Sequence, residues 1–334
     1  MNPALTVRPY EPGDERAILR AHDHVFGHVD PEHRPKSLEV WRWQFEANPA
    51  GSRSVVALGA RGEVLGQYAG LRQRVHSEVG VVNFTQAIDS MNARGAASGL
   101  ARTSAFVRAG EVFLERFCGE GADRDHVVYG LTIPSAWRVG AQRLGYEHLR
   151  TTLVLAARHE ELSTPAAARL VVEESDRCPP DIGELFAVLA AERGVIAVRD
   201  RAAMDWRFTR HPAQRYVFGV VREHRALRGV GVFRRGKFAG LEGGLVCDWL
   251  APGADEQAQR ALLAWFRAKS EQSGATRLVA LFPDTAPEWL AFQRRGFRVL
   301  PTEYILATRS FRAPFDRDYL FWRWFYTLAD TDLV

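Results

Sequence analysis

The chain has 334 residues, more than one domain usually contains, and its 46% hydrophobic and 11% aromatic content is enough to bury more than one core. Extended disorder is therefore excluded over most of the length. The net charge is only +4, with basic and acidic residues intermixed, so no nucleic-acid partner is expected. The first residues lack a signal-peptide core and no apolar run approaches about 20 residues, so we expect a cytoplasmic protein with no membrane partner.

The first predicted elements are a strand at residues 7–10, a helix and a β-hairpin. The helix has one face formed by Ile18, Leu19, His22, Val25 and Phe26. After the segment Trp43–Pro49, alternating apolar residues at 54–58 lead through the turn 60–63 into a second apolar run, as in a hairpin.

A long strand at 86–91 and a loop at 92–103 follow, and then an amphipathic helix that contains Phe106 and Phe113. A further strand is predicted at 126–130. The chain then enters a helix that ends at Gly145 and a strand at 151–156. The same order of elements, with a helix N-cap at Asp255, is expected in the second half.

Three sequence matches relate the two halves of the chain. The matched pairs are Trp43–Pro49 with Trp206–Pro212, Ala87–Met91 with Val246–Leu250, and Leu144–Tyr146 with Arg295–Phe297. The offsets fall in order from 163 to 159 to 151 residues, which indicates a duplication whose second copy has lost short segments. We predict an α/β fold (an α+β mixed sheet with helices on both faces) in each copy, with domains at 1–160 and 180–334 and a linker at 161–179.

This order of elements resembles the GCN5-related N-acetyltransferase (GNAT) superfamily, and the duplication resembles its tandem two-domain bacterial members. The resemblance implies an acyltransferase, an N-acetyltransferase that uses acetyl-CoA or another acyl-CoA and acts on an amine of a small molecule or peptide. A homodimer stays an open alternative. In the family, the fourth strand pairs with the pantetheine arm, and an R-x-x-G-x-[GA] loop opens a helix whose N–H groups bind the pyrophosphate.

The strand 86–91 and the loop 92–103 match this part of the family. Two registers fit the loop motif: Arg94–Gly99, and Gly99–Ser104, which is preferred because it places the turn at the helix start. The resemblance implies the cofactor-binding residues Ser90, Met91, Arg94, Gly95, Gly99, Ala101, Arg102, Thr103, Ser104 and Trp137. A plain glycine-containing loop followed by an N-cap is the alternative, and for Trp137 the alternative is a core position.

Two positions depart from the family pattern. Pro134 and Ala141 stand where the family has an asparagine and the tyrosine that often protonates the departing thiolate. In the second copy, residues 251–255 supply one glycine, no arginine and the acidic Asp255, which would repel a phosphate. The second copy is therefore expected to be degenerate, without a CoA site.

Acyl transfer to an amine needs a neutral amine, a donor for the oxyanion and help for the leaving thiolate. Asp89 is a candidate base or substrate anchor, although its recurrence as Asp248 in the degenerate copy favours a structural role. Tyr129, with His126 on the same predicted strand, is the other catalytic candidate. The strand register decides which side chain faces the site.

Cysteines and histidines give no metal-ligand pattern. Cys118, Cys178 and Cys247 are far apart and form no C-x-x-C pair. The histidines His22, His24, His28 and His33 cluster with Asp23 and Asp30, but Gly27 is expected to end the helix, so they need not share a face. No metal site is expected. A polar wall of the acceptor site and ordinary surface histidines are the alternatives.

The aromatic C-terminus, residues 319–334, is expected to fold back as a final element on the seam between the domains, with a docking patch as the alternative. Two other functions stay open. A non-catalytic acyl-CoA-binding or scaffold protein is favoured by the missing tyrosine. A Fem-type aminoacyl transferase would also pair two such folds, but a more basic chain with a helical arm is then expected.

Overall fold

The computed structural model describes residues 5–28, 33–93, 104–163 and 169–332. Within these ranges, no helix has both the length and the apolar character needed to cross a membrane. The chain divides into two compact units. Unit 1 contains residues 1–74, 82–150 and 305–317, and unit 2 contains residues 75–81, 151–304 and 318–334.

Unit 1 is a mixed sheet with helices on both faces. Its strands, in spatial order, are β1 (Thr6–Pro9), β2 (Ser52–Leu58), β3 (Val64–Ser77), β4 (Gly80–Asn92), β5 (Val127–Thr132) and residues 305–310 of β13 (Arg298–Ser310). Its helices are α1 (Glu15–Phe26), α2 (Leu38–Phe45), α3 (Ala105–Phe117) and α4 (Pro134–Arg143). The strands β4 and β5 run parallel, and β5 and β13 run antiparallel.

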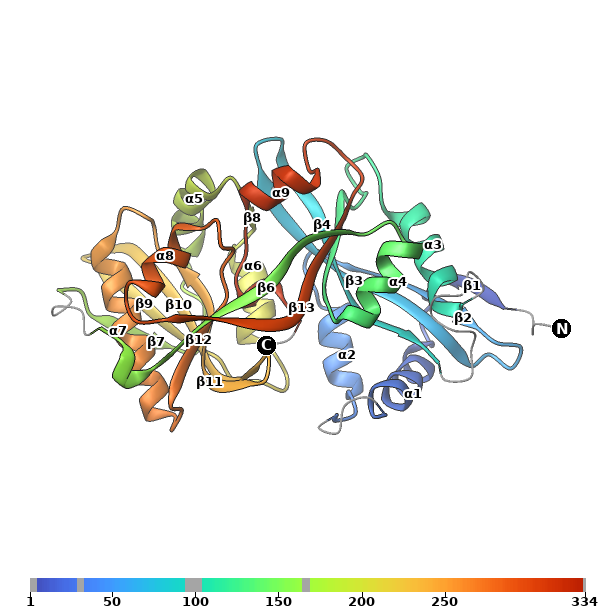
Figure 1. The fold of residues 1–334 in the computed structure, drawn as a ribbon, viewed down its shortest axis with the longest axis horizontal. Helices are drawn as coiled ribbons and strands as arrows, with labels where there is room; N and C mark the ends of the chain where they lie inside the picture. The colour runs from blue at the N-terminus through green and yellow to red at the C-terminus, as the bar shows by residue number, and fades with distance from the viewer. Residues whose placement is uncertain (1–4, 29–32, 94–103, 164–168, 333–334) are drawn as a thin grey trace. The chain divides into compact units, whose positions relative to one another are not determined.

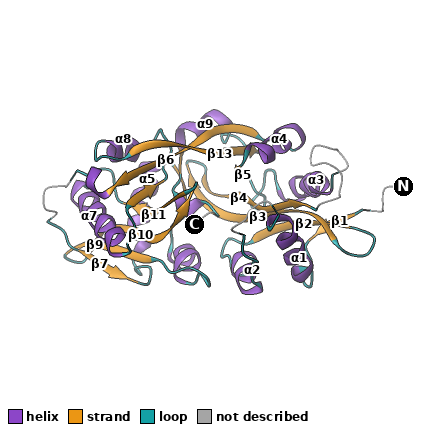
Figure 2. Ribbon diagram, turned by 60° about the horizontal axis from the view of Figure 1, so that its bottom comes forward, coloured by secondary structure: helices purple, strands orange, loops and turns teal. Residues whose placement is uncertain are grey.

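The alternation of side chains along β2 explains why helices cover both faces. Val56 points toward α1, where it packs with Ile18, whereas its neighbour Val55 packs with Phe113 of α3. Figure 2 shows α1 and α2 on one side of these strands and α3 and α4 on the other. The predicted mixed α/β arrangement is confirmed.

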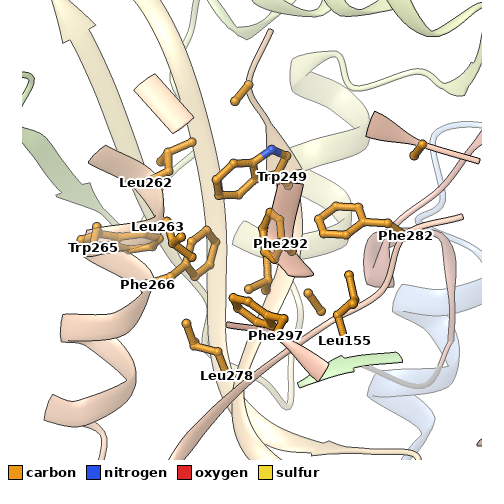
Figure 3. Packing of buried hydrophobic residues seen from close by; sticks show 14 of the residues in the cluster. Leu155, Trp249, Leu262, Leu263, Trp265, Phe266, Leu278, Phe282, Phe292 and Phe297 are labelled. Atoms are coloured by element: carbon orange, nitrogen blue, oxygen red, sulfur yellow. The ribbon is translucent and has the colours of Figure 1, made fainter. Parts of the chain in front are cut away.

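Unit 2 repeats this plan. Its strands are the main part of β6 (Glu147–Arg158), β7 (Val172–Ser175), β8 (Val195–Ala197), β9 (Val217–Glu223), β10 (Ala226–Phe238), β11 (Leu241–Leu250), β12 (Arg277–Ala280), residues 298–304 of β13 and β14 (Trp324–Phe325). Its helices are α5 (Ile182–Arg193), α6 (Arg201–Met204), α7 (Glu256–Gln272), α8 (Pro287–Gln293) and α9 (Arg317–Arg323), with short helical turns at His159–Glu161, Asp205–Thr209 and Leu328–Asp330. Aromatic side chains such as Trp249, Phe266 and Phe292 fill its core (Figure 3).

The two units exchange segments relative to the expected boundaries of 1–160 and 180–334. Residues 151–158 of β6 belong to unit 2, where they pair with β12, and residues 305–317 belong to unit 1, where β13 pairs with β5. Figure 1 shows β6 in green and β13 in red as neighbouring strands. The expected linker 161–179 contains β7, which pairs with β9. Sequence matches locate a strand, but they do not say to which unit its residues belong.

The duplicated W-x-F motif forms the same corner in both units. Trp43 and Trp206 are both buried. Asn48 Oδ1 accepts a hydrogen bond from the Ala50 N–H at 3.0 Å, and the matched His211 accepts at Nδ1 from the Ala213 N–H at 3.1 Å. The Asn48 amide oxygen and the His211 Nδ1 are therefore equivalent hydrogen-bond acceptors. Because only an unprotonated ring nitrogen can accept, His211 must be uncharged.

Replacing His211 by Asn, the residue of the first copy, is expected to keep this turn while removing a pH dependence. Burial, with Arg207 and Arg234 nearby, lowers the pKa of His211 to about 3. Because the unfolded chain binds this proton below about pH 6.5, the wild type should lose stability as the pH falls from about 6.5 toward 3. Urea unfolding at a series of pH values should show a shallower decline for H211N, and parallel declines would contradict the assignment.

The C-terminal segment packs within unit 2, where β14 pairs with β8. Phe325 lies near Phe282, with ring centroids 6.2 Å apart. Thr327 donates from Oγ1 to the carbonyl oxygen of Cys247 on β11 at 3.4 Å. The segment does fold back as a final element, and its contacts here are with the strand end of unit 2.

Candidate functional site

The strands β4 and β5 separate partway along their length. Their parallel pairing runs through Phe84–Val127, Thr85–Val128 and Gln86–Tyr129. Beyond Gln86, β4 continues to Asn92 and β5 continues to Thr132, and no pairing between these fully described strand ends is present. Strands that part in this way leave backbone N–H and C=O groups along the gap available to a ligand.

The far end of β4 is tied to the start of α3. The side-chain oxygen of Asn92 accepts hydrogen bonds from the Phe106 N–H and the Ser104 hydroxyl, each at 3.2 Å. Ser104 is the N-cap of α3 and accepts from the Val107 N–H. Gly66 on β3 lies directly beneath this turn, because a Cβ there would come within 2.6 Å of the Ala105 carbonyl carbon. The gap therefore leads to a helix N-terminus, where oxyanions are favoured.

Asp89, at the gap end of β4, is the centre of a polar cluster. Its Oδ2 accepts a hydrogen bond from the Lys36 ammonium, and its Oδ1 lies 3.4 Å from Nε2 of His22. Lys36 also donates to Oε1 of Gln44 at 2.7 Å. Gln67 donates from Nε2 to the Asp89 carbonyl oxygen at 3.2 Å. The cluster joins α1, the last turn of α2 (Gln44), the segment before α2 (Lys36), β3 and β4.

The backbone and the charge of Asp89 are both unusual. Its φ of +46° lies in the left-handed region, which non-glycine residues in strands rarely adopt. Such strain persists where the surroundings over-determine it, often at functional sites. Burial alone would raise the pKa of Asp89, but the Lys36 ammonium and the His22 contact together hold it well below its usual range. Asp89 is therefore an ionised carboxylate that binds protons weakly.

Solved structures share the fold of this protein over most of the chain. A GCN5-related N-acetyltransferase from Anabaena variabilis is 12% identical, with a TM-score of 0.66 over 92% of this chain and 73% of its own. A probable N-acyltransferase from Enterococcus faecalis is 12% identical, with a TM-score of 0.65 over 92% and 72%. A tandem GNAT protein from the clavulanic acid biosynthesis pathway is 15% identical, with a TM-score of 0.57 over 94% of this chain and 100% of its own.

The fold is the tandem GNAT fold. No model of a protein family matches the sequence, and no curated protein matches it either. At 12–15% identity, the likeness establishes the GNAT fold and its two-domain arrangement. This likeness does not establish an activity or a substrate.

The predicted cofactor-binding residues divide into described and undescribed groups. Ser90 is partly exposed at the gap end of β4, whereas the Met91 side chain is buried in the cluster with Ile18 of α1. Trp137 is partly exposed on α4, where its ring meets His148 edge to face at 5.8 Å. The remaining predicted residues lie outside the described part of the chain: Arg94, Gly95, Gly99, Ala101, Arg102 and Thr103.

The catalytic candidates do not form one group. Tyr129 belongs to the last β4–β5 pair, and only 1% of its surface is exposed, so its hydroxyl does not reach an open site in this structure. His126 is also buried, and burial lowers its pKa. Its Nε2 lies 3.4 Å from Arg312, away from the Asp89 cluster. Of the three, Asp89 alone lies at the gap end of β4.

The second GNAT unit has the same strand separation, but its gap is filled. β11 pairs with β12 as far as Val246–Ala280 and then continues to Leu250. The matched strand end, Cys247–Leu250, is completely buried, and Thr327 of the C-terminal segment bonds to it. The helix after this strand, α7, is capped by Asp255, whose Oδ1 accepts from the Ala258 N–H and whose Oδ2 accepts from Arg228.

Sequence reasoning missed Lys36, Gln44 and Gln67. Lys36 lies 53 residues before Asp89, so only the tertiary structure joins them. One signal was available. Arg199 follows Lys36 by 163 residues, the offset that relates Trp43 to Trp206, and Arg199 donates to Asp248 at 2.8 Å. The cation and the carboxylate therefore recur together in the second unit.

Proposed function

We propose that the chain is an acyl-CoA-dependent N-acyltransferase whose single acyl-CoA site is in unit 1. The site comprises the β4–β5 gap, the N-terminus of α3 and, on the family's pattern, Arg94, Gly95, Gly99, Ala101, Arg102 and Thr103. A cytoplasmic location and a small-molecule or peptide amine as acceptor, with no nucleic acid or membrane partner, remain part of this proposal.

One observation carries the proposal: the strand end beyond the last strand pair is partly exposed in unit 1 and buried in unit 2. At the end of β4, Ala87, Asp89 and Ser90 are all partly exposed, whereas the matched residues of β11 are fully buried beneath Thr327 and its neighbours. The N-terminus of α3 is capped by the neutral Ser104 and Asn92, but that of α7 is capped by a carboxylate. A phosphate-bearing ligand fits the first unit and is repelled by the second.

The reaction joins the nitrogen of a neutral amine to the carbonyl carbon of the thioester. The new C–N bond forms, the C–S bond breaks, the sulfur leaves as the thiolate, and one proton passes from nitrogen to sulfur by way of water. Backbone N–H groups of β4 near Ser90 are the candidate donors to the developing oxyanion. The side chain of Asp89 is too weak a base at neutral pH to remove that proton efficiently, so its proposed role is positioning.

Isothermal titration with acetyl-CoA tests this proposal. The wild type should bind, and replacing Arg94 and Arg102 together by Ala should weaken binding at least about tenfold, because each arginine contact to phosphate is charge-assisted. The same double substitution at Arg235 and Arg267, on unit 2, is the matched control and should leave affinity unchanged. If the wild type does not bind acetyl-CoA, the proposal is contradicted.

A thiol-release assay across a panel of amines then separates catalysis from mere binding. Release of free CoA with an amine present supports the transferase. Binding without release would favour a non-catalytic acyl-CoA-binding protein. That alternative is supported by Ala141, which stands where the family's tyrosine acid is expected.

A further inference from the structure

The two ion pairs at the strand ends are equivalent by sequence and by contact. Lys36 corresponds to Arg199 at an offset of 163 residues, and Asp89 corresponds to Asp248 at 159. Each cation immediately precedes the N-cap of the next helix, Ser37 in one unit and Asp200 in the other. In both units the cation donates to the carboxylate. The two units differ in the additional groups that bind the cation and the carboxylate.

In unit 2, the short segment Thr327–Asp330 forms hydrogen bonds with both Arg199 and Asp248. The carboxylate of Asp330 accepts two hydrogen bonds from the Arg199 guanidinium, at 2.9 and 2.7 Å. The hydroxyl of Thr327 donates to Asp248 at 2.8 Å. Thr327 and Asp330 are themselves joined, because the Thr327 N–H donates to Asp330 at 2.9 Å. The Arg199 guanidinium thus gains a second carboxylate, that of Asp330. The Asp248 carboxylate gains a second hydrogen-bond donor, the Thr327 hydroxyl.

Among the described residues of unit 1, the Lys36–Asp89 pair has no such partner. The Lys36 ammonium has three N–H groups, and among the described residues it meets two acceptors, Asp89 and Gln44. His22 faces Asp89 at 3.4 Å, longer than an ordinary hydrogen bond, and its Nδ1 is buried without a partner in the described residues. The side chains of Lys36 and Asp89 are 14% and 12% exposed, against 6% and 0% for Arg199 and Asp248.

We propose that the Lys36–Asp89 pair recognises an acceptor of the amino-acid class, with its carboxylate on Lys36 and its amino group on Asp89. The ligand would repeat, in unit 1, the contacts that Asp330 and Thr327 make in unit 2. Because a zwitterion brings one charge of each sign, it joins the pair without leaving a buried charge uncompensated. This inference rests on the proposed function for the acyl step, but recognition itself does not require acyl-CoA.

The amino group must lose a proton before it reacts. An ammonium held by Asp89 gives that proton to water. The neutral nitrogen then forms the C–N bond while the C–S bond of the thioester breaks, and a second proton passes from nitrogen to the leaving thiolate by way of water. Asp89 stays ionised throughout and acts as a positioning residue. Asp89 would thus hold the amine at the gap end of β4, beside Ser90, where its lone pair faces the proposed thioester position.

Ligand binding to the full chain without acetyl-CoA tests the recognition step. Pools of L-amino acids are screened by thermal shift, and each hit is then titrated by calorimetry beside its own carboxamide, which lacks the negative charge. We expect the amino acid to bind about tenfold or more tightly than its amide. Equal affinity of acid and amide, or no hit in any pool, would overturn the proposal.

Variants at Lys36 locate the effect. K36M should remove the difference between acid and amide, whereas K36R, which recreates the cation of unit 2, should keep it. If K36M does not fold, the double variant K36Q/D89N removes both charges and should likewise show no difference. K269M, which breaks the Lys269–Glu174 pair on unit 2, is the matched control and should bind like the wild type. An acid preference that survives in K36M or K36Q/D89N contradicts the assignment.

A parallel titration with acetyl-CoA keeps the two proposals apart. If acetyl-CoA binds but acids and amides do not differ, the acceptor class is wrong and the acyl-CoA site stands. If amino acids bind through Lys36 but acetyl-CoA does not bind, the recognition site stands and the acyltransferase proposal fails.

Discussion

Replacing Arg199 by methionine is expected to lower the free energy of unfolding by about 3–5 kcal/mol. Arg199 lies between Asp248 and Asp330, and all three side chains are buried. Removing the guanidinium leaves two carboxylates facing each other in the interior with no cation between them. Urea unfolding followed by circular dichroism at pH 7 measures the loss.

Two comparison variants make this result interpretable. K269M removes one cation from a partly exposed pair with Glu174, and it should cost no more than about 1 kcal/mol because water screens that pair. Adding Asp248→Asn and Asp330→Asn to R199M removes the uncompensated charges and should recover part of the loss. If R199M and K269M cost the same, the buried network contributes little to stability.

Replacing Gly66 by alanine is expected to weaken acetyl-CoA binding about tenfold. A Cβ at Gly66 would lie 2.6 Å from the Ala105 carbonyl carbon and 2.7 Å from the Phe106 nitrogen. These are backbone atoms in the first turn of α3, so the helix start must shift, at a cost of about 1–3 kcal/mol. Since that turn borders the proposed pyrophosphate site, calorimetric titration should show the shift as lost affinity.

The second copy offers the matched control for this substitution. Gly229 follows Gly66 by 163 residues and lies beneath α7, but its Cβ would meet the flexible Leu262 side chain at 3.2 Å. G229A should therefore cost less stability than G66A and leave acetyl-CoA affinity unchanged. Equal losses of affinity in both variants would mean that α3 does not border the cofactor site.

The predictable part of the fold is the part that short stretches of sequence determine. The hairpins, the α3 and α7 helices and the Asp255 N-cap follow from periodicity and capping within a few residues. The duplication could also be predicted from the sequence, because Trp43 and Trp206 lie in matched motifs. The ordered offsets predicted two units of the same plan, which the structure confirms.

The candidate site was only partly predictable. Asp89 was named from its place on the fourth strand, but its role depends on Lys36, which lies 53 residues away, and on a positive φ. Tyr129 was the weaker candidate, and one residue of register decides whether a strand side chain faces a gap or a core. The structure places it in the core.

The sequence by itself predicted a duplicated mixed α/β unit, and it showed that residues 251–255 of the second copy carry one glycine, no arginine and the acidic Asp255. Only the tertiary structure decided that β6 and β13 are each divided between the two units, and that Thr327 and Asp330 bind the Asp248 and Arg199 side chains at the second gap. The physical reason is that strand partners and ion pairs join residues far apart in the chain. Such contacts leave no local pattern of hydrophobicity or turn residues to be read.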